Sequence, residues 1–320
     1  MITEQSVHVN DINRDRQPYR ITTESSVERL AESVAQAGVL NPCILLKGAE
    51  GFVVVSGHRR VEACMHAGLT NVPGLVVDTA DDEAGALLYC AKAAVADNAF
   101  SRTLNMVEKA KALVLLQRHM SLDQIVTNSA AVFNEPLSGK IVQKLITVGG
   151  QTGEVHRLIL DSRLSVNTVE KLQGFDPVIR EKFIKLFQGI KMNQNKQLKV
   201  VTFLQEIAAR EKISLADLFD TEKIDSIISM DNPDENLKAA RLRAYLAERR
   251  FPELSRAYRE HKSAVKDLGI HPHIRLDPPL DFEGDTYRIS FDFKSVEEFH
   301  RALDSLIRIR YSERLRDVII

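Results

Sequence analysis

The sequence predicts a multidomain α+β protein whose parts differ in their pattern of apolar residues. Short apolar runs and helical stretches alternate in the first 100 residues, helical spacing dominates from 101 to 268, and two alternating strands precede an amphipathic helix in 269–320. A chain of 320 residues is long enough for two or three domains. We expect an α/β domain over 1–100, an all-helical domain over 101–212, a helical linker region over 213–268 and a small ββα domain over 269–320.

The elements of the first domain are separated by clear breaks. Apolar runs of strand length are bounded by glycine, proline and polar residues, and longer stretches repeat apolar residues at helical spacing. The expected elements are, in order, an edge strand at 7–13, a helix from about Ser25 or Ser26 to Gly38, a hairpin made by 42–46 and 52–55, a helix, a strand at 72–78 and a helix at 81–95 that leads to Asp97.

The most informative stretch follows the apolar run 52–55. Gly57, His58, Arg59 and Arg60 lie where a strand turns into a helix. Such a junction presents free backbone N–H groups and the positive end of the helix dipole, and two forked guanidinium groups beside it favour a phosphate. Gly57 lets the backbone approach that anion closely. The alternative interpretation is a basic helix start that is simply solvated.

The order of these pieces resembles the N-terminal domain of the ParB family of chromosome and plasmid partition proteins. The resemblance implies a ParB/sulfiredoxin-like fold that binds CTP, with Gly57, Arg59 and Arg60 around the triphosphate. His58 stands where the family commonly has Glu, and either donates to phosphate or only occupies the turn. The segments that carry the resemblance are 30–34, 38–42, 56–63, 67–69 and 72–73.

A second family motif is a Glu-Asn pair followed by an arginine and a proline. Here the corresponding residues are Asp97, Asn98, Arg102 and Met106. The resemblance implies that Asp97 and Asn98 hold Mg²⁺, that Asn98 and Arg102 contact the nucleotide, and that Asp97 supports slow CTP hydrolysis. Because the acid is one methylene shorter and the arginine one place later than usual, binding is the firmer expectation than hydrolysis. Asp97 and Asn98 are alternatively an N-cap or turn pair before the next helix.

The helical middle contains a candidate helix-turn-helix. The helix at 139–148 buries its apolar residues on one side and leaves Lys140, Gln143, Lys144 and Thr147 for a DNA major groove. The predicted connection to the preceding helix, residues 128–137, is longer than the usual turn of a helix-turn-helix. The outward set also lacks arginine, so a purely structural helix pair is the alternative.

The end of the chain predicts a self-association domain. A turn at 231–234 lies inside the linker region, and the strands near 273–276 and 287–293 precede a helix that Ser295 caps. Two strands and one helix cannot bury their apolar faces alone, so a second copy is the expected cover. This segment is similar to the small dimerising domain of chromosomal ParB proteins.

Composition restricts the function classes. The net charge of -1 excludes a uniformly basic nucleic-acid binder but allows local basic patches. Without a membrane-length apolar run or a secretion signal, we expect a cytoplasmic, nucleoid- or plasmid-associated protein. Its three cysteines are far apart in the sequence and lie in apolar surroundings, which favours buried thiols over a disulfide framework or a zinc site.

These features predict a homodimeric, CTP- and Mg²⁺-dependent clamp on double-stranded DNA in chromosome or plasmid partitioning. Whether it is also a slow CTP hydrolase stays open. ParB proteins usually carry a basic N-terminal tail that stimulates a ParA-type ATPase, and its absence before about Val7 makes that partner doubtful. The alternatives are a ParB-like transcriptional regulator without nucleotide switching and a small-molecule kinase or sulfiredoxin-like enzyme on the same N-terminal fold.

Overall fold

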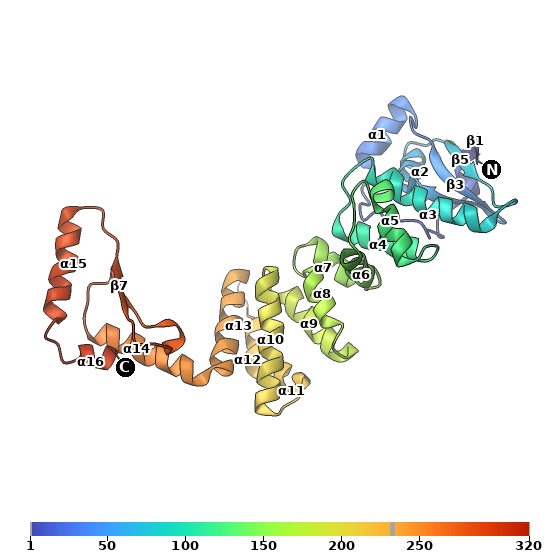
Figure 1. Cartoon of the computed structure of the whole chain (residues 1–320). Coiled ribbons are helices and arrows are strands. Elements are labelled where there is room, and N and C mark those ends of the chain that lie inside the picture. Colours follow the sequence, from blue (N-terminus) through green and yellow to red (C-terminus); the bar gives the residue numbers. More distant parts are fainter. Residues whose placement is uncertain (1, 231–233, 320) are drawn as a thin grey trace. The chain divides into compact units, whose positions relative to one another are not determined.

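The computed structural model describes residues 2–230 and 234–319, and the chain divides into two compact units, 1–198 and 199–320. The first unit contains a mixed α/β part followed by helices, and the second is helical with one small sheet (Figure 1). The turn expected at 231–234 falls largely outside the described residues. No helix in the described part of the chain is both long and apolar enough to cross a membrane.

A mixed five-stranded sheet forms the base of the first unit. Its strand order is β1-β5-β3-β4-β2, with β1 antiparallel to β5, β5 parallel to β3, β3 antiparallel to β4, and β4 parallel to β2. The strands are β1 (Ile2–His8), β2 (Ile12–Asn13), β3 (Cys43–Gly48), β4 (Gly51–Ser56) and β5 (Asn71–Val77). The predicted hairpin and the strand after it are therefore confirmed.

Helices cover this sheet and supply its apolar core. Val34, Val61 and Cys64 pack with Leu45 and Val54 of the sheet and are almost inaccessible to solvent. At about 25 cal/mol per Å² of apolar surface, such burial is the main stabilisation of this layer. The covering helices are α1 (Glu28–Ala37), α2 (His58–His66) and α3 (Glu83–Ala99).

Three predicted boundaries in this part are wrong. The helix expected at 81–95 runs as α3 from Glu83 to Ala99 and includes Asp97. The single edge strand at 7–13 is interrupted, because residues 9–11 form a 3₁₀ turn whose Val9 N–H donates to Thr70 O at 2.9 Å. Helix α1 begins at Glu28 rather than at Ser25 or Ser26. Its N-cap residue is Val27, which has no capping side chain, and the Ser26 hydroxyl donates to the Glu28 carboxylate at 2.6 Å.

Helices fill the rest of the first unit. Helix α4 (Met106–Gln117) packs against α6 (Gly139–Gly149) and α7 (Gly153–Leu160), and α6 also contacts α8 (Val166–Leu172). The remaining helices are α5 (Leu122–Phe133), α9 (Pro177–Gly189) and α10 (Gln194–Glu211), of which α10 runs across the boundary between the units.

The connection between α5 and α6 is shorter than predicted. Helix α5 continues to Phe133 because its polar residues make bonds inside the helix: Asn128 donates to Gln124 O at 2.7 Å and Ser129 to Val126 O at 2.7 Å. Asn134 then ends the helix with a φ of 58°. Residues 134–138 connect the two helices, so the expected ten-residue connection is wrong.

The second unit combines a charged helical region with a small sheet. Helix α13 (Glu235–Arg250) ends just before Pro252, which begins α14 (Pro252–Asp267). Strands β6 (Ile274–Asp277) and β7 (Arg288–Phe291) pair antiparallel and precede α15 (Val296–Ile309), which Ser295 caps. Shorter elements are α11 (Leu215–Phe219), α12 (Glu222–Ile228), the 3₁₀ turn η2 (Leu280–Phe282) and α16 (Leu315–Val318).

Candidate functional site

A cavity of about 240 Å³ lies where β4 turns into α2. Its walls come from the segment before α1, from the first turn of α2 and from the last turn of α3. Residues that are up to 83 positions apart, Tyr19 and Arg102, therefore meet at one place. The cavity brings together all residues that the sequence assigns to nucleotide and metal: Gly57, His58, Arg59, Arg60, Asp97, Asn98 and Arg102.

The turn into α2 has no room for a side chain. Gly57 is the N-cap residue and has φ 97° and ψ 21°, a left-handed conformation that glycine adopts most easily. A Cβ built there would lie 2.8 Å from Cys43 Sγ and 3.0 Å from Arg60 Nε. No side chain among the described residues caps this end of α2, so its first N–H groups are free for an anion.

Arg60 is held in place from two sides. Its Nη1 donates to the backbone oxygens of Asn41 at 2.9 Å and Pro42 at 2.7 Å, and its Nη2 to Asp97 Oδ2 at 2.8 Å. The Asp97 carboxylate also accepts a hydrogen bond from the Ser56 hydroxyl, which is buried. The guanidinium is thus oriented before any ligand arrives.

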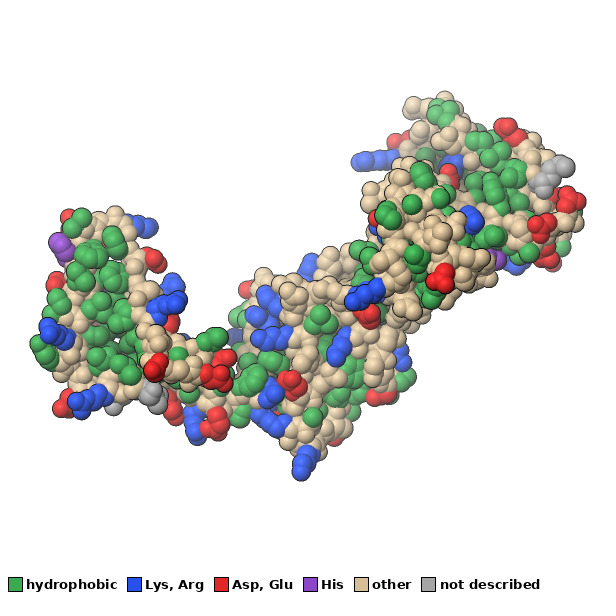
Figure 2. Space-filling model, in the orientation of Figure 1, with side chains coloured by type: hydrophobic (Ala, Val, Ile, Leu, Met, Phe, Trp, Pro, Cys, Tyr) green, Lys and Arg blue, Asp and Glu red, His purple; other side chains and the backbone are tan. Residues whose placement is uncertain are grey.

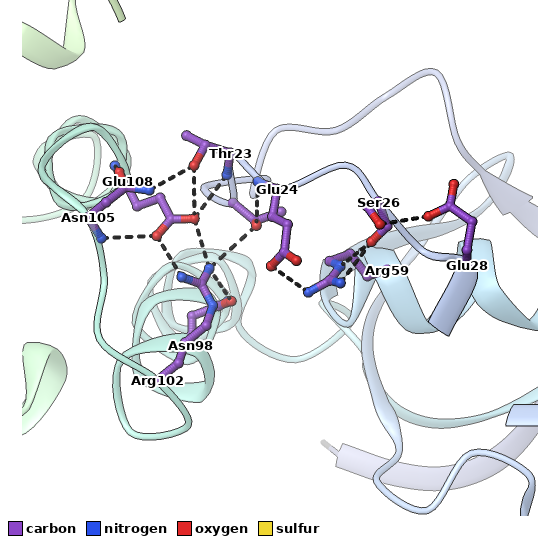
Figure 3. A network of polar contacts seen from close by, with 10 residues as sticks. Thr23, Glu24, Ser26, Glu28, Arg59, Asn98, Arg102, Asn105 and Glu108 are labelled. Atoms are coloured by element: carbon purple, nitrogen blue, oxygen red, sulfur yellow. Dashed lines mark hydrogen bonds and ion pairs between the residues drawn. The ribbon is translucent and has the colours of Figure 1, made fainter. Parts of the chain in front are cut away.

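Arg59 faces the segment that precedes α1. Its Nη1 lies 2.7 Å from Glu24 Oε2, while Nε and Nη2 donate to the Ser26 carbonyl at 3.2 and 2.8 Å (Figure 3). The Arg59 side chain is 30% exposed and that of Glu24 is 53% exposed. The sequence did not indicate Glu24 as part of the site.

Arg102 is paired to a buried carboxylate. Glu108, at 1% exposure, accepts from Arg102 Nη1 at 2.6 Å and from Nη2 at 2.9 Å (Figure 3). It also accepts from the backbone N–H groups of Thr23 at 2.9 Å and Asn105 at 3.1 Å. Burial would raise the pKa of Glu108, but the hydrogen bonds from Arg102, Thr23 and Asn105 outweigh it, so the pKa lies below its usual value.

Glu108 is a second residue that sequence reasoning missed. Asn105 and Glu108 form a capping box at the start of α4, in which each side chain accepts from the other residue's backbone N–H. The Asn-x-x-Glu spacing before an apolar run is the sequence signal that would have located it. That Arg102 also contacts a nucleotide stays a prediction.

His58 contributes a nitrogen without a partner. Its Nε2 is buried and makes no hydrogen bond within the described residues. Burial lowers the pKa of His58 to about 4, and the charge of Arg20 acts in the same direction. The imidazole is therefore neutral at pH 7, and Nε2 is a buried polar atom without a partner among the described residues.

Asp97 and Asn98 lie in the last turn of α3, so their interpretation as an N-cap or turn pair before the next helix is wrong. Asn98 Nδ2 donates to Ala94 O at 2.9 Å, and Asn98 Oδ1 lies 3.5 Å from Arg102 Nη2. Within residues 2–230 and 234–319, no three His, Cys, Asp or Glu side chains lie close enough to hold a metal by themselves. Asp97 and Asn98 would supply a carboxylate and an amide oxygen, which are donors that Mg²⁺ prefers, and that they bind it stays a prediction.

Comparison with known proteins decides the family of this domain. The sequence profile of the family described as ParB N-terminal domain matches residues 2–91. These residues are a ParB N-terminal domain. The expected ParB resemblance is thus confirmed for the part of the chain that carries β1 to β5, α1 and α2.

Curated relatives of the ParB domain are partition proteins. The chain is 25% identical over 193 residues to a probable plasmid-partitioning protein ParB of Xylella fastidiosa, covering 59% of this chain and 45% of that protein. It is 32% identical over 111 residues to the chromosome-partitioning protein Spo0J of Thermus thermophilus, covering 34% and 39%. The matches thus span less than half the length of these relatives.

The solved structures matched by this chain include that of a C-terminally truncated chromosome-partitioning protein ParB from Caulobacter crescentus complexed with CTP-gamma-S. The alignment covers 57% of this chain and 98% of that one, at 22% identity and a TM-score of 0.26.

The helices after the ParB domain carry the four residues assigned to DNA. All lie on α6, where Lys140 and Gln143 are exposed. Lys144 instead pairs with α8, since its Nζ lies 2.9 Å from Glu170 Oε2 and 2.5 Å from Asn167 Oδ1. Thr147 is half-buried and donates to Gln143 O at 3.2 Å. Their contact with DNA stays a prediction.

Proposed function

We propose that this chain is a ParB-type, CTP-dependent DNA-binding protein of chromosome or plasmid partitioning. The observation that carries the proposal is the convergence, in a ParB N-terminal domain, of Arg59, Arg60, Asp97 and Asn98 on one cavity beside a glycine turn with no room for a Cβ. Such a turn suits an anion held by backbone N–H groups and forked guanidinium donors.

In this proposal, different residues around the cavity bind different parts of CTP and its Mg²⁺. The free N–H groups of the first turn of α2 and the preset Arg60 guanidinium bind phosphate oxygens. Mg²⁺, held by Asp97 and Asn98 together with the phosphates, neutralises charge on the triphosphate. Asp97 is also the candidate to orient a water for slow hydrolysis, an activity that is secondary to binding in this proposal.

Double-stranded DNA is the proposed partner of the helices that follow. Helices α5 and α6 are joined by five residues, 134–138, and the exposed Lys140 and Gln143 lie near the start of α6. In a helix-turn-helix, the first part of the second helix enters the major groove. Lys140 then contacts phosphate or a base edge, and Gln143 contributes hydrogen bonds to a base.

A second copy of the chain is the proposed cover for the C-terminal apolar surface. The second unit exposes several large apolar side chains around β7 and α15, and Figure 2 shows hydrophobic side chains gathered on this part of the molecule. An apolar stripe of this kind typically marks a protein interface. The exposed residues are Ile289 (49%), Phe293 (53%), Val296 (63%), Leu303 (36%) and Ile307 (63%).

The experiment that tests the proposal is titration calorimetry of the full chain with CTP, ATP, GTP and UTP, each with Mg²⁺. Each nucleotide is titrated with and without a pool of bacterial genomic DNA fragments. The proposal predicts that CTP binds most tightly and that DNA strengthens its binding. Preference for ATP would favour the kinase or sulfiredoxin-like alternative, and DNA binding that ignores every nucleotide would favour the regulator.

A further inference from the structure

Glu24 accepts from one donor, Nη1, of Arg59, a residue that borders the cavity. It lies on the segment 22–26, which lines the cavity through Thr22 and leads into α1. Arg59 directs all three guanidinium nitrogens at this segment: Nη1 at the Glu24 carboxylate, and Nε and Nη2 at the Ser26 carbonyl (Figure 3). Arg59 therefore cannot make its full set of contacts to a ligand while this arrangement persists.

We propose that Glu24 competes with the ligand phosphate for Arg59 and thereby sets the affinity of the site. Glu24 contacts Arg59 through one carboxylate oxygen, so Glu24 Oε2 and a phosphate oxygen compete for the same Nη1 donor. Glu24 is thus an affinity-determining residue in a segment that the phosphate motif does not include. This inference rests on the proposed nucleotide-binding function of the same cavity.

The Glu24 ion pair is suited to exchange. More than half of the Glu24 side chain and about a third of the Arg59 side chain are exposed, at 53% and 30%. Exposed ion pairs of this type contribute little, because water screens them. A triphosphate carries several negative charges against one on Glu24, so it displaces the carboxylate, with some loss of affinity.

The neighbouring end of the segment is fixed. Thr23 donates its N–H to the buried Glu108 at 2.9 Å and its hydroxyl to the same oxygen at 3.3 Å. Asn105 Nδ2 also donates to Thr23 Oγ1 at 2.8 Å. When Arg59 turns to a phosphate, Thr23 stays anchored, and the rearrangement is confined to the residues between Thr23 and α1.

The first test compares the affinity of wild-type, Glu24→Gln and Glu28→Gln proteins for tripolyphosphate and for CTP with Mg²⁺. Glu28 is the matched control, because it carries the same charge near the same segment and accepts from Ser26 Oγ at 2.6 Å. Glu24→Gln should bind both ligands roughly two- to fivefold more tightly, since a screened competing charge has gone. Glu28→Gln should bind as the wild type does.

The second test is hydrogen exchange of the ligand-free proteins. Glu24→Gln should accelerate amide exchange in residues 24–27 and leave the Thr23 amide protected. Equal CTP affinity in wild type and Glu24→Gln, or a weaker affinity in Glu24→Gln, would overturn the inference while leaving the proposed function intact. If none of the three proteins binds CTP or tripolyphosphate, both the proposed function and the inference fail.

Discussion

Arg60 Nη2 lies 2.8 Å from Asp97 Oδ2, which joins the phosphate motif at the start of α2 to the acidic motif at the end of α3. The two residues are 37 positions apart. The Ser56 hydroxyl donates to the same Asp97 oxygen, so the cation, the acid and the turn between them form one preset group. In the account given above, this group meets the phosphates and Mg²⁺ of CTP together.

The turn at Gly57 should tolerate no side chain. In Gly57→Ala the alanine must adopt a backbone φ of 97°, and its Cβ must approach Cys43 Sγ to 2.8 Å. A non-glycine residue in this conformation is destabilised by roughly 1–2 kcal/mol, and the close contact adds to that. Calorimetric melting should show the loss in the first unit. A Gly57→Ala/Cys43→Ala double variant, compared with Cys43→Ala alone, should show a smaller loss, and an undiminished loss would contradict the role of the Sγ contact.

Replacing Glu108 should loosen the junction of segment 22–26 with α4. Glu108→Gln leaves the Arg102 guanidinium without its buried counter-charge. The Thr23 and Asn105 N–H groups donate to different oxygens of Glu108, so one of them would face an NH₂ that cannot accept. Because Arg102 is 33% exposed, water offsets part of the effect, and we expect a destabilisation of about 2 kcal/mol. Denaturant unfolding of the first unit, followed by circular dichroism, measures it. Arg102→Ala would still leave an unpaired buried carboxylate, so it should be at least as harmful.

The low pKa of His58 predicts an acid sensitivity. The folded protein holds the imidazole neutral down to about pH 4, whereas in the unfolded chain it titrates near 6.5. The stabilisation is therefore fully present above pH 6.5 and is lost as the pH falls toward 4, by up to roughly 3 kcal/mol. The difference in unfolding free energy between wild type and His58→Gln should change by this amount between pH 6.5 and 4. A pH-independent difference would show that His58 titrates normally in the fold.

Two lysines of α6 should differ in their effect on DNA binding. Lys140 is exposed, whereas Lys144 is engaged with Glu170 and Asn167 of α8. Lys140→Ala should weaken binding to genomic fragments and reduce the slope of log affinity against log salt by about 1. Lys144→Ala should change the slope less, because its charge is already neutralised. A larger effect at Lys144 than at Lys140 would reject this orientation of α6.

Local sequence patterns were enough to predict the secondary-structure elements around the cavity. The apolar run 52–55, the glycine after it and the helical spacing beyond predicted β4, the turn and α2 without knowledge of the rest of the chain. The edge strand was harder, because residues 2–6 are exposed and β1 is defined by its pairing with β5 about 70 residues away. The end of α5 was missed because Asn128 and Ser129 favour loops, yet inside this helix they bond to preceding carbonyls.

The residues of the candidate site likewise fall into those that the sequence predicted and those that it missed. Gly57, Arg59 and Arg60 lie within four positions of the sequence, so they could be recognised as an anion-binding motif from the sequence alone. Their partners could not, since Glu24 lies 35 positions from Arg59 and Thr23 lies 85 from Glu108. The segment 22–26 brings those groups together, because it contacts α4 through Thr23 and α2 through Glu24.

The most direct test of the central claim is titration of CTP with Mg²⁺ into wild-type and Arg60→Ala proteins, with Lys140→Ala as a control far along the sequence from the ParB domain. Arg60 provides two charge-assisted contacts of roughly 1.5 kcal/mol each, so its loss should weaken CTP binding at least about 100-fold. Lys140→Ala should bind CTP normally, and the oligomeric state in sedimentation should be the same for all three proteins. If Arg60→Ala keeps wild-type affinity for CTP, the nucleotide does not bind at this turn and the account is wrong.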